Sequence, residues 1–212
     1  MAPSTWLSLP PEAEVFGLAP LARFYRWHAP IYDWTRPLIL FGRARLLAEL
    51  VLTAGDVVLD VGCGTGWSFG RLTKRGALVI GVEPSPAMRE RAERRIAKLG
   101  LEGRVVLDPR PYGSHRDLRD RSDAIVMSYS LTMMPAFERA LVAARADLRP
   151  GGRLGVVDFL EGRTPLVDRW LAANHVGPGR ARLERLRELF PRHRLRIVDS
   201  GLWRHFLFWA SA

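Results

Sequence analysis

The sequence predicts a doubly wound α/β fold: a mostly parallel sheet of seven strands, with helices on both faces and an N-terminal helical cap. Three observations support this fold class. Short apolar runs rich in β-branched residues alternate with helix-like stretches from residue 57 onward. The first run, Val57 to Val61, leads directly into a glycine-rich turn, Gly62 to Gly66. The second run ends at Glu83, about twenty residues after the first glycine, a spacing typical of nucleotide-binding βαβ units.

Each element follows from its local pattern. We expect a proline-rich arm over 1–20 and a helical cap up to residue 50, and we expect residues 51–212 to form the sheet domain. Strands are predicted at 57–61, 78–82, 104–107, 123–128, 153–158, 195–200 and 203–210. Helices are predicted at 44–52, 66–75, 85–99, 135–148, 163–174 and 179–190, with a Pro150-Gly151-Gly152 turn before the fifth strand.

Composition limits the class of protein. At 212 residues and 48% hydrophobic content, the chain is long enough for one domain with a substantial core. The single cysteine, Cys63, excludes an internal disulfide. The N-terminus has no basic region followed by an apolar core, and no segment approaches 18 uninterrupted apolar residues. We therefore expect a cytoplasmic protein that lies, at most, at the inner face of a membrane.

The net charge of +10 has two interpretations. Arginine-rich helices, such as the stretch from Pro86 to Leu99, also contain glutamates and are typical of solvated faces with i,i+4 pairs. Alternatively, the charge serves an anionic partner, either a membrane surface or nucleic acid. The basic stretches lack the interleaved aromatic residues typical of single-strand binding, which disfavours nucleic acid.

The glycine-rich turn is the strongest functional signal. Glycine adopts backbone angles closed to other residues, and its missing side chain lets a ligand lie against the main chain. Here three glycines alternate after an acid, in the pattern D-x-G-x-G-x-G from Asp60 to Gly66. Within this turn Cys63 is expected to act as a small packing residue rather than as a nucleophile, since no histidine partner is evident. The sequence predicts no metal site.

This pattern resembles motif I of the class I S-adenosylmethionine (SAM)-dependent methyltransferases. The resemblance implies a Rossmann-like fold, SAM as cofactor and S-adenosylhomocysteine as product. Glu83 lies where an acid would accept the ribose hydroxyls, and Asp108, after the third strand, where many such enzymes contact adenine. The stretch Asp108 to Tyr112 otherwise looks like a rigid proline loop. The implied cofactor contacts are Asp60, Gly62, Cys63, Gly64, Gly66, Glu83, Pro84, Met88 and Asp108.

Further stretches resemble a narrower group, the bacterial diacylglycerylhomoserine N-methyltransferases. They are Tyr32 to Arg36 with Phe41 to Arg43, Ser128 to Pro135, Val156 to Phe159, and Asn174 to Val176. These enzymes methylate a lipid amine, which implies an amino-lipid acceptor of the betaine-lipid or phosphatidylethanolamine type. The alternatives are a soluble small-molecule or quinone acceptor, and a SAM-binding protein without catalysis.

Residues for the acceptor side follow from the same reasoning. The carboxyl end of the fourth strand faces the methyl group, so Ser128 and Tyr129 are expected beside the cofactor and the acceptor. Aromatic faces stabilise a methylated ammonium, and Tyr32, Trp34 and Tyr129 are candidates for that contact. Core packing explains Tyr32 and Tyr129 equally well, and it is the favoured explanation for Trp34. His175 is a candidate base. Arg43 is a candidate partner for the SAM carboxylate or an anionic head group, or else a surface arginine.

Overall fold

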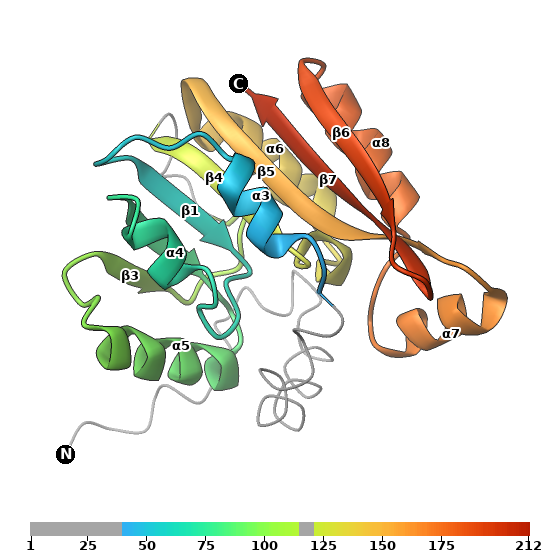
Figure 1. The fold of residues 1–212 in the computed structure, drawn as a ribbon, viewed down its shortest axis with the longest axis horizontal. Coiled ribbons are helices and arrows are strands. Elements are labelled where there is room, and N and C mark those ends of the chain that lie inside the picture. Colours follow the sequence, from blue (N-terminus) through green and yellow to red (C-terminus); the bar gives the residue numbers. More distant parts are fainter. Residues whose placement is uncertain (1–39, 115–120) are drawn as a thin grey trace.

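The structure is a computed structural model that describes residues 40–114 and 121–212 (Figure 1). The predicted arm, most of the predicted cap and the candidates Tyr32 and Trp34 lie outside the described residues. The described chain begins at Leu40, just before helix α3, Arg43–Glu49.

A single seven-stranded sheet organises the described chain, in the order β3-β2-β1-β4-β5-β7-β6. All neighbouring pairs are parallel except those made by β7, which runs antiparallel to both β5 and β6. This confirms the predicted doubly wound, mostly parallel sheet. The strands are β1 Val57–Val61, β2 Leu78–Val82, β3 Val105–Asp108, β4 Ser122–Ser128, β5 Leu148–Gly162, β6 His193–Asp199 and β7 Trp203–Ser211.

Helices cover both faces of this sheet (Figure 1). Leu46 of α3, Leu72 of α4 and Ile96 of α5 lie in one buried apolar cluster, while Leu141 of α6 and Leu186 of α8 lie in a second. Two cores on opposite faces are the expected result for strands buried on both sides. The helices after α3 are α4 Phe69–Thr73, α5 Pro86–Leu99, α6 Phe137–Asp147, α7 Pro165–Ala173 and α8 Gly179–Leu189.

The strand register brings four carboxyl ends to one edge. Val61 pairs with Val82 and with Met127, and Val82 pairs with Asp108. The residues that follow these strands are therefore level with one another, which is the place where open α/β sheets bind ligands.

Several predicted boundaries differ from those of the structure, and the starts of α4 and β5 differ for clear local reasons. Helix α4 begins at Phe69 rather than near Gly66, because Gly66 has a left-handed backbone (φ +75°) that a right-handed helix does not accept. Strand β5 begins at Leu148 rather than at Arg153, because Leu148 already pairs with Ser122 before a register shift. The predicted glycine turn thus lies inside an irregular strand.

The longest helix of the described residues, α5, has 14 residues. No helix in the part of the chain that the structure describes is long and apolar enough to cross a membrane.

Candidate functional site

The glycine loop between β1 and α4 is fixed to the neighbouring strand. The backbone N–H groups of Gly62 and Cys63 both donate to the carbonyl of Val82, at 2.8 and 3.2 Å. Gly62, Gly64 and Gly66 all have positive φ, of 70°, 57° and 75°. This backbone path is the one predicted from the three alternating glycines, since L side chains rarely adopt it.

The three glycines differ in what surrounds them. A Cβ at Gly62 would lie 2.4 Å from Cβ of Ser130, and one at Gly66 would lie 2.5 Å from the ring of Phe69. A Cβ at Gly64 would meet nothing within 4 Å. The outer two glycines are therefore required by packing within the protein, whereas the backbone of Gly64 is open to a ligand.

Two buried carboxylates flank this loop. The hydroxyl of Ser68 donates to Asp60, and burial raises the pKa of Asp60 to about 6. Glu83 accepts hydrogen bonds from the backbone N–H of Gly64, at 3.0 Å, and of Ser85, at 2.9 Å. Burial raises the pKa of Glu83 to about 7. The structure thus brings together the two acids that the sequence assigned to the cofactor.

Arg89 holds the turn that carries Glu83. Its guanidinium is buried and donates to the backbone carbonyls of Glu83 and Pro84, both at 3.0 Å. Because the guanidinium is desolvated, its pKa is lowered. Sequence reasoning missed this role and treated Arg89 as one of many surface arginines. Met88 is buried, at 1% exposure, and its contact with the cofactor stays a prediction.

Asp108, at the end of β3, forms an ion pair with Arg110, two residues further along the chain. Its carboxylate accepts hydrogen bonds from the backbone N–H of Arg110, at 2.8 Å, and from Nη2 of the same residue, at 2.8 Å. Its backbone carbonyl accepts from the N–H of Glu83, at 3.0 Å. The predicted adenine contact therefore lies beside Glu83, with its charge balanced by Arg110.

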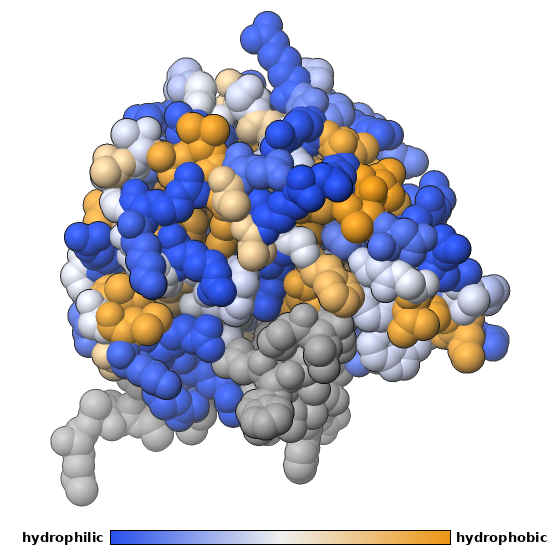
Figure 2. All heavy atoms as spheres, in the orientation of Figure 1, coloured by the Kyte–Doolittle hydropathy of each residue, from blue (hydrophilic) through white to orange (hydrophobic). Residues whose placement is uncertain are grey.

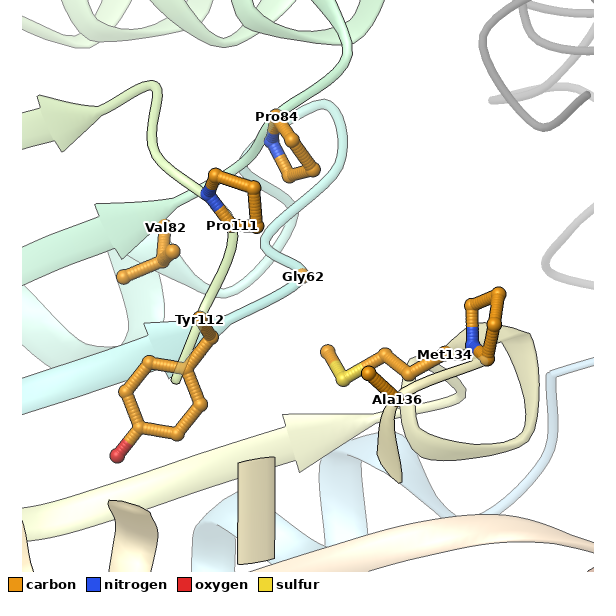
Figure 3. Close-up of a pocket in the computed structure, with 8 residues that line it drawn as sticks. Gly62, Val82, Pro84, Pro111, Tyr112, Met134 and Ala136 are labelled. Carbon is orange, nitrogen blue, oxygen red and sulfur yellow. The ribbon is translucent and has the colours of Figure 1, made fainter. Parts of the chain in front are cut away.

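A narrow pocket of about 30 Å³ lies between these strand ends and the segment after β4 (Figure 3). Gly62 lies between the two proline rings on one side and the side chain of Met134 on the other. A single water needs about 10–15 Å³, so the pocket has room for about two waters, and Met134, a flexible side chain, forms one of its walls. The lining residues are Gly62, Val82, Pro84, Pro111, Tyr112, Met134, Pro135 and Ala136.

The segment after β4 begins with a strained residue. Tyr129 has a positive φ of 55°, uncommon for a residue with a side chain, and its hydroxyl donates to the carbonyl of Phe41 at 2.8 Å. Burial raises the pKa of this hydroxyl well above its usual range. The hydroxyls of Ser128 and Ser130 are buried without a hydrogen-bond partner among residues 40–114 and 121–212.

The buried carboxylate of Asp158 holds the residues that follow Tyr129 in place. Asp158 of β5 is fully buried and accepts hydrogen bonds from both the backbone N–H and the hydroxyl of Thr132. Arg182 of α8 donates to the carbonyls of Leu131, at 3.2 Å, and Met134, at 3.4 Å. Burial raises the pKa of Asp158 to about 6. The resemblance included Asp158, but its contact with Thr132 could not be read from the sequence.

Arg43 lies beside the glycine loop. Its guanidinium is 4.2 Å from the ring centre of Trp67. Burial raises the pKa values of both Asp60 and Tyr129, and the positive charge of Arg43 offsets a part of each rise. The predicted cofactor partner is thus close to the acid that ends β1. Cys63, in the same loop, is buried, and burial raises the pKa of its thiol, which disfavours a nucleophilic role.

His175 lies on the turn between α7 and α8, where it is exposed and has a φ of 62°. The same turn contacts the segment after β4 through the N–H of Gly177, which donates to the carbonyl of Thr132 at 2.7 Å. The candidate base, His175, therefore belongs to a turn that contacts the segment after β4, but His175 does not line the pocket of Figure 3.

A row of aromatic rings continues outward from Tyr129. The ring of Tyr129 is 4.7 Å from Phe159, Phe159 is 5.8 Å from Trp203, and Trp203 is 6.3 Å from Trp170. Trp170 is 46% exposed, so the row runs from the end of β4 to the surface. Sequence reasoning had assigned Trp203 to a core strand and had not connected it with the site.

The fold and the glycine loop together are similar to those of the class I SAM-dependent methyltransferases. Residues 58–152 match the family model described as a methyltransferase domain. A solved SAM-dependent methyltransferase from Aquifex aeolicus shares the fold, with a TM-score of 0.64 at 21% identity over 84% of this chain and 92% of that one. Haemonchus contortus phosphoethanolamine N-methyltransferase 2, in complex with SAM, has a TM-score of 0.66 at 14% identity, over 80% of this chain and 52% of that one.

Two named relatives that are similar in sequence act on different acceptors. A demethylmenaquinone methyltransferase of Tropheryma whipplei is 32% identical over 148 residues, covering 66% of this chain and 59% of the relative. The 27-O-demethylrifamycin SV methyltransferase of Amycolatopsis mediterranei is 38% identical over 120 residues, covering 55% of this chain and 43% of the relative. The chain thus spans about half the length of these relatives. By their names, one methylates a quinone precursor and the other a rifamycin, not a lipid amine.

Proposed function

We propose that the protein transfers the methyl group of SAM to a small organic acceptor. The observation that carries this proposal is the open backbone of Gly64, flanked by the buried carboxylates of Asp60 and Glu83. In this proposal the cationic end of SAM lies near Asp60, its carboxylate near Arg43 and its ribose near Glu83. The adenine enters the pocket of Figure 3 when Met134 moves aside.

The chemistry resides in the cofactor. SAM presents a methyl group on a positive sulfur. An electron pair of the acceptor, either a lone pair on a heteroatom or the π electrons of a hydroxyl-activated ring carbon, displaces that sulfur in line; S-adenosylhomocysteine leaves and the acceptor gives up a proton. The protein supplies position and electrostatics. Carboxylates near the cofactor attract its positive charge, and the segment after β4, with the buried hydroxyls of Ser128 and Ser130, lies on the acceptor side.

We propose a planar, largely apolar acceptor, as in a quinone precursor or an aromatic polyketide. The names of the two curated relatives support this class. The rings of Tyr129, Phe159 and Trp203, each at 5% exposure, pack edge-to-face and make an apolar region that begins at the end of β4.

Cofactor binding is tested at Gly64. The variant Gly64→Ala places a methyl group on the open face of the loop, so we expect SAM binding to be lost in calorimetry. The matched control is Gly100→Ala, because Gly100 also has a left-handed backbone (φ +62°) with nothing within 4 Å of an added Cβ. Equal SAM affinity in both variants would show that the cofactor does not lie against Gly64.

The acceptor is tested with labelled SAM. We expect label transfer to a short-chain demethylnaphthoquinol or to a phenolic polyketide, and no transfer with the Gly64→Ala variant. If wild-type protein binds SAM but labels none of these acceptors while labelling an amine, the acceptor proposal is wrong and the methyltransferase proposal stands.

A second candidate, an amino-lipid acceptor, is favoured by one surface feature. Leu166 and Trp170 of α7 and the neighbouring Leu202 are 75%, 46% and 61% exposed. Figure 2 shows apolar residues over the region of α7, at the lower right. Trp170 begins the aromatic row that leads inward to Tyr129, so a membrane at this surface would lie at the outer end of that row.

The two candidates are separated by vesicles. If the acceptor is a lipid, phosphatidylethanolamine vesicles accept label, and Leu166→Ser with Trp170→Ser lowers that transfer while SAM affinity is unchanged. If label reaches only the soluble quinol, at the same rate in the double variant, the lipid candidate is excluded.

A further inference from the structure

A basic groove lies on the surface between α4 and α5, away from the pocket of Figure 3. It is open and has a volume of about 660 Å³. Figure 2 shows hydrophilic residues, in blue, over much of the region of these two helices. The groove is lined by Trp67, Gly70, Arg71, Lys74, Arg91, Arg94, Arg95, Lys98 and Leu99.

The lining of this groove carries six basic residues and no acid. The sequence pattern predicted that the arginines of α5 would be neutralised by i,i+4 pairs, and Arg94 does pair with Glu90, at 2.8 Å. However, Arg91 is followed four residues later by Arg95, and Arg94 by Lys98, which are like-charge neighbours on one helix face. The fold adds Arg71 and Lys74 from α4 to the same groove.

This convergence cannot be read from either helix alone. Like charges on two facing elements repel, and a concave surface of one sign concentrates the field that attracts anions. Guanidinium groups bind phosphate oxygens through paired N–H donors, and several arginines favour a ligand with several phosphates over a single carboxylate.

One end of the groove reaches the glycine loop. Two guanidinium groups contact the ring of Trp67: Arg71 is 3.9 Å and Arg43 4.2 Å from its centre. Arg71 also donates to the backbone carbonyl of Trp67, at 3.0 Å. Arg71 and Arg43 therefore share the ring of Trp67. A ligand that binds Arg71 in the groove would contact a side chain that packs on the same ring as Arg43, the arginine near Asp60.

We propose that this groove binds a compact anion that carries several phosphate groups. The concave shape suits a small polyanion more than a flat bilayer or a long strand. The same chemistry is present in free oligophosphates and in multiply phosphorylated lipid head groups.

Inorganic tripolyphosphate is the probe for this proposal. We expect it to bind the full chain in calorimetry, to raise the melting temperature, and to lose about tenfold in affinity between about 50 and 200 mM salt. The double variant Arg91→Gln/Lys98→Gln removes two groove charges, and we expect it to bind at least about fivefold more weakly. The control, Arg187→Gln/Arg192→Gln, removes two exposed charges outside the groove lining, and we expect its affinity to be unchanged.

Three outcomes overturn the proposal. They are no binding of tripolyphosphate, equal weakening in the groove and control variants, and tighter binding of a single-stranded RNA that strengthens with its length. Binding of cardiolipin vesicles by wild-type protein, lost in the groove variant, supports the proposal and identifies a lipid head group. Tripolyphosphate binding without vesicle binding supports it and identifies a free anion.

Discussion

The carboxylate of Glu83 accepts a hydrogen bond from the backbone N–H of Gly64 at 3.0 Å, so the acid that follows β2 is joined to the loop that follows β1. The other carboxylate oxygen accepts from Ser85 at 2.9 Å. Both oxygens thus have fixed directions, and the acid and the open part of the loop form one rigid unit at the candidate cofactor site.

Replacing this acid is expected to weaken cofactor binding. In Glu83→Gln, one carboxylate oxygen becomes an NH2 group, which cannot accept a hydrogen bond. The variant therefore loses the hydrogen bond from either the N–H of Gly64 or the N–H of Ser85. Hydrogen bonds to charged groups contribute about 1.5–3 kcal/mol, so we expect SAM to bind at least about tenfold more weakly in calorimetry. Glu93→Gln, an exposed change on α5, is the control and should leave affinity unchanged. Equal affinities for all three proteins would contradict the role of Glu83.

Stability and cofactor affinity are expected to change in opposite directions with pH. Burial raises the pKa of Glu83 from 4.5 to about 7, and that of Asp60 from 3.8 to about 6. The folded chain therefore holds protons that the unfolded chain has lost, so the free energy of unfolding falls as pH rises through this range. Cationic SAM prefers the ionised acids, so its affinity rises over the same range.

Urea unfolding and calorimetry at about pH 5.5 and about pH 7.5 test this. The wild-type protein should be more stable at the lower pH and should bind SAM more tightly at the higher one. Glu83→Gln removes one titrating group and should flatten both changes. If stability instead increases with pH across this range, the two acids are not buried as described.

Gly62 is expected to be required for folding, because Ser130 occupies the space that a side chain at this position would need. In Gly62→Ala the new Cβ would lie 2.4 Å from Cβ of Ser130, in addition to the strain of a positive φ. Gly55→Ala is the matched control, since Gly55 also has a positive φ, of 92°, but no neighbour within 4 Å. We expect Gly62→Ala to lower the free energy of unfolding by about 1–3 kcal/mol more than the control. Similar losses would mean that the segment after β4 moves aside easily.

The hydroxyl of Thr132 is expected to stabilise the protein through Asp158. Thr132→Val keeps the side-chain shape but removes a donor to a buried carboxylate, so we expect a loss of about 1–3 kcal/mol in urea unfolding. Thr53→Val is the control, because the side chain of Thr53 is exposed. A loss no larger than that of the control would show that water replaces the hydroxyl.

The sequence predicted the sheet well because its evidence is local. Strands β1 and β2 were predicted with correct ends, since each is a short β-branched run followed by an acid or a glycine. The start of α4 was not, because it depends on the left-handed backbone of Gly66 and on the ring of Phe69 beside it. Such contacts arise only when the chain is folded.

The candidate site likewise has features that could be predicted from the sequence and contacts that could not. The left-handed backbone at Gly62 and Gly64 could be predicted from the spacing of the glycines, since the motif encodes a backbone path. Their contact with a cofactor, and that of Asp60, stays a prediction. Arg89, Thr132 and Arg182 could not, because nothing in their spacing indicates which carbonyl or carboxylate each one contacts. The role of Tyr32 stays a prediction, as it lies outside the described residues.

The direction of β7 has a practical consequence for changing acceptor preference. Because β7 runs antiparallel to β5, its first residue, Trp203, pairs with Gly162, the last residue of β5. Ala210, near the end of β7, pairs with Leu154 in the first half of β5. Libraries that aim to alter the acceptor should therefore randomise the beginning of β7 together with the end of β5. Substitutions near Ala210 would sample stability and leave selectivity unchanged.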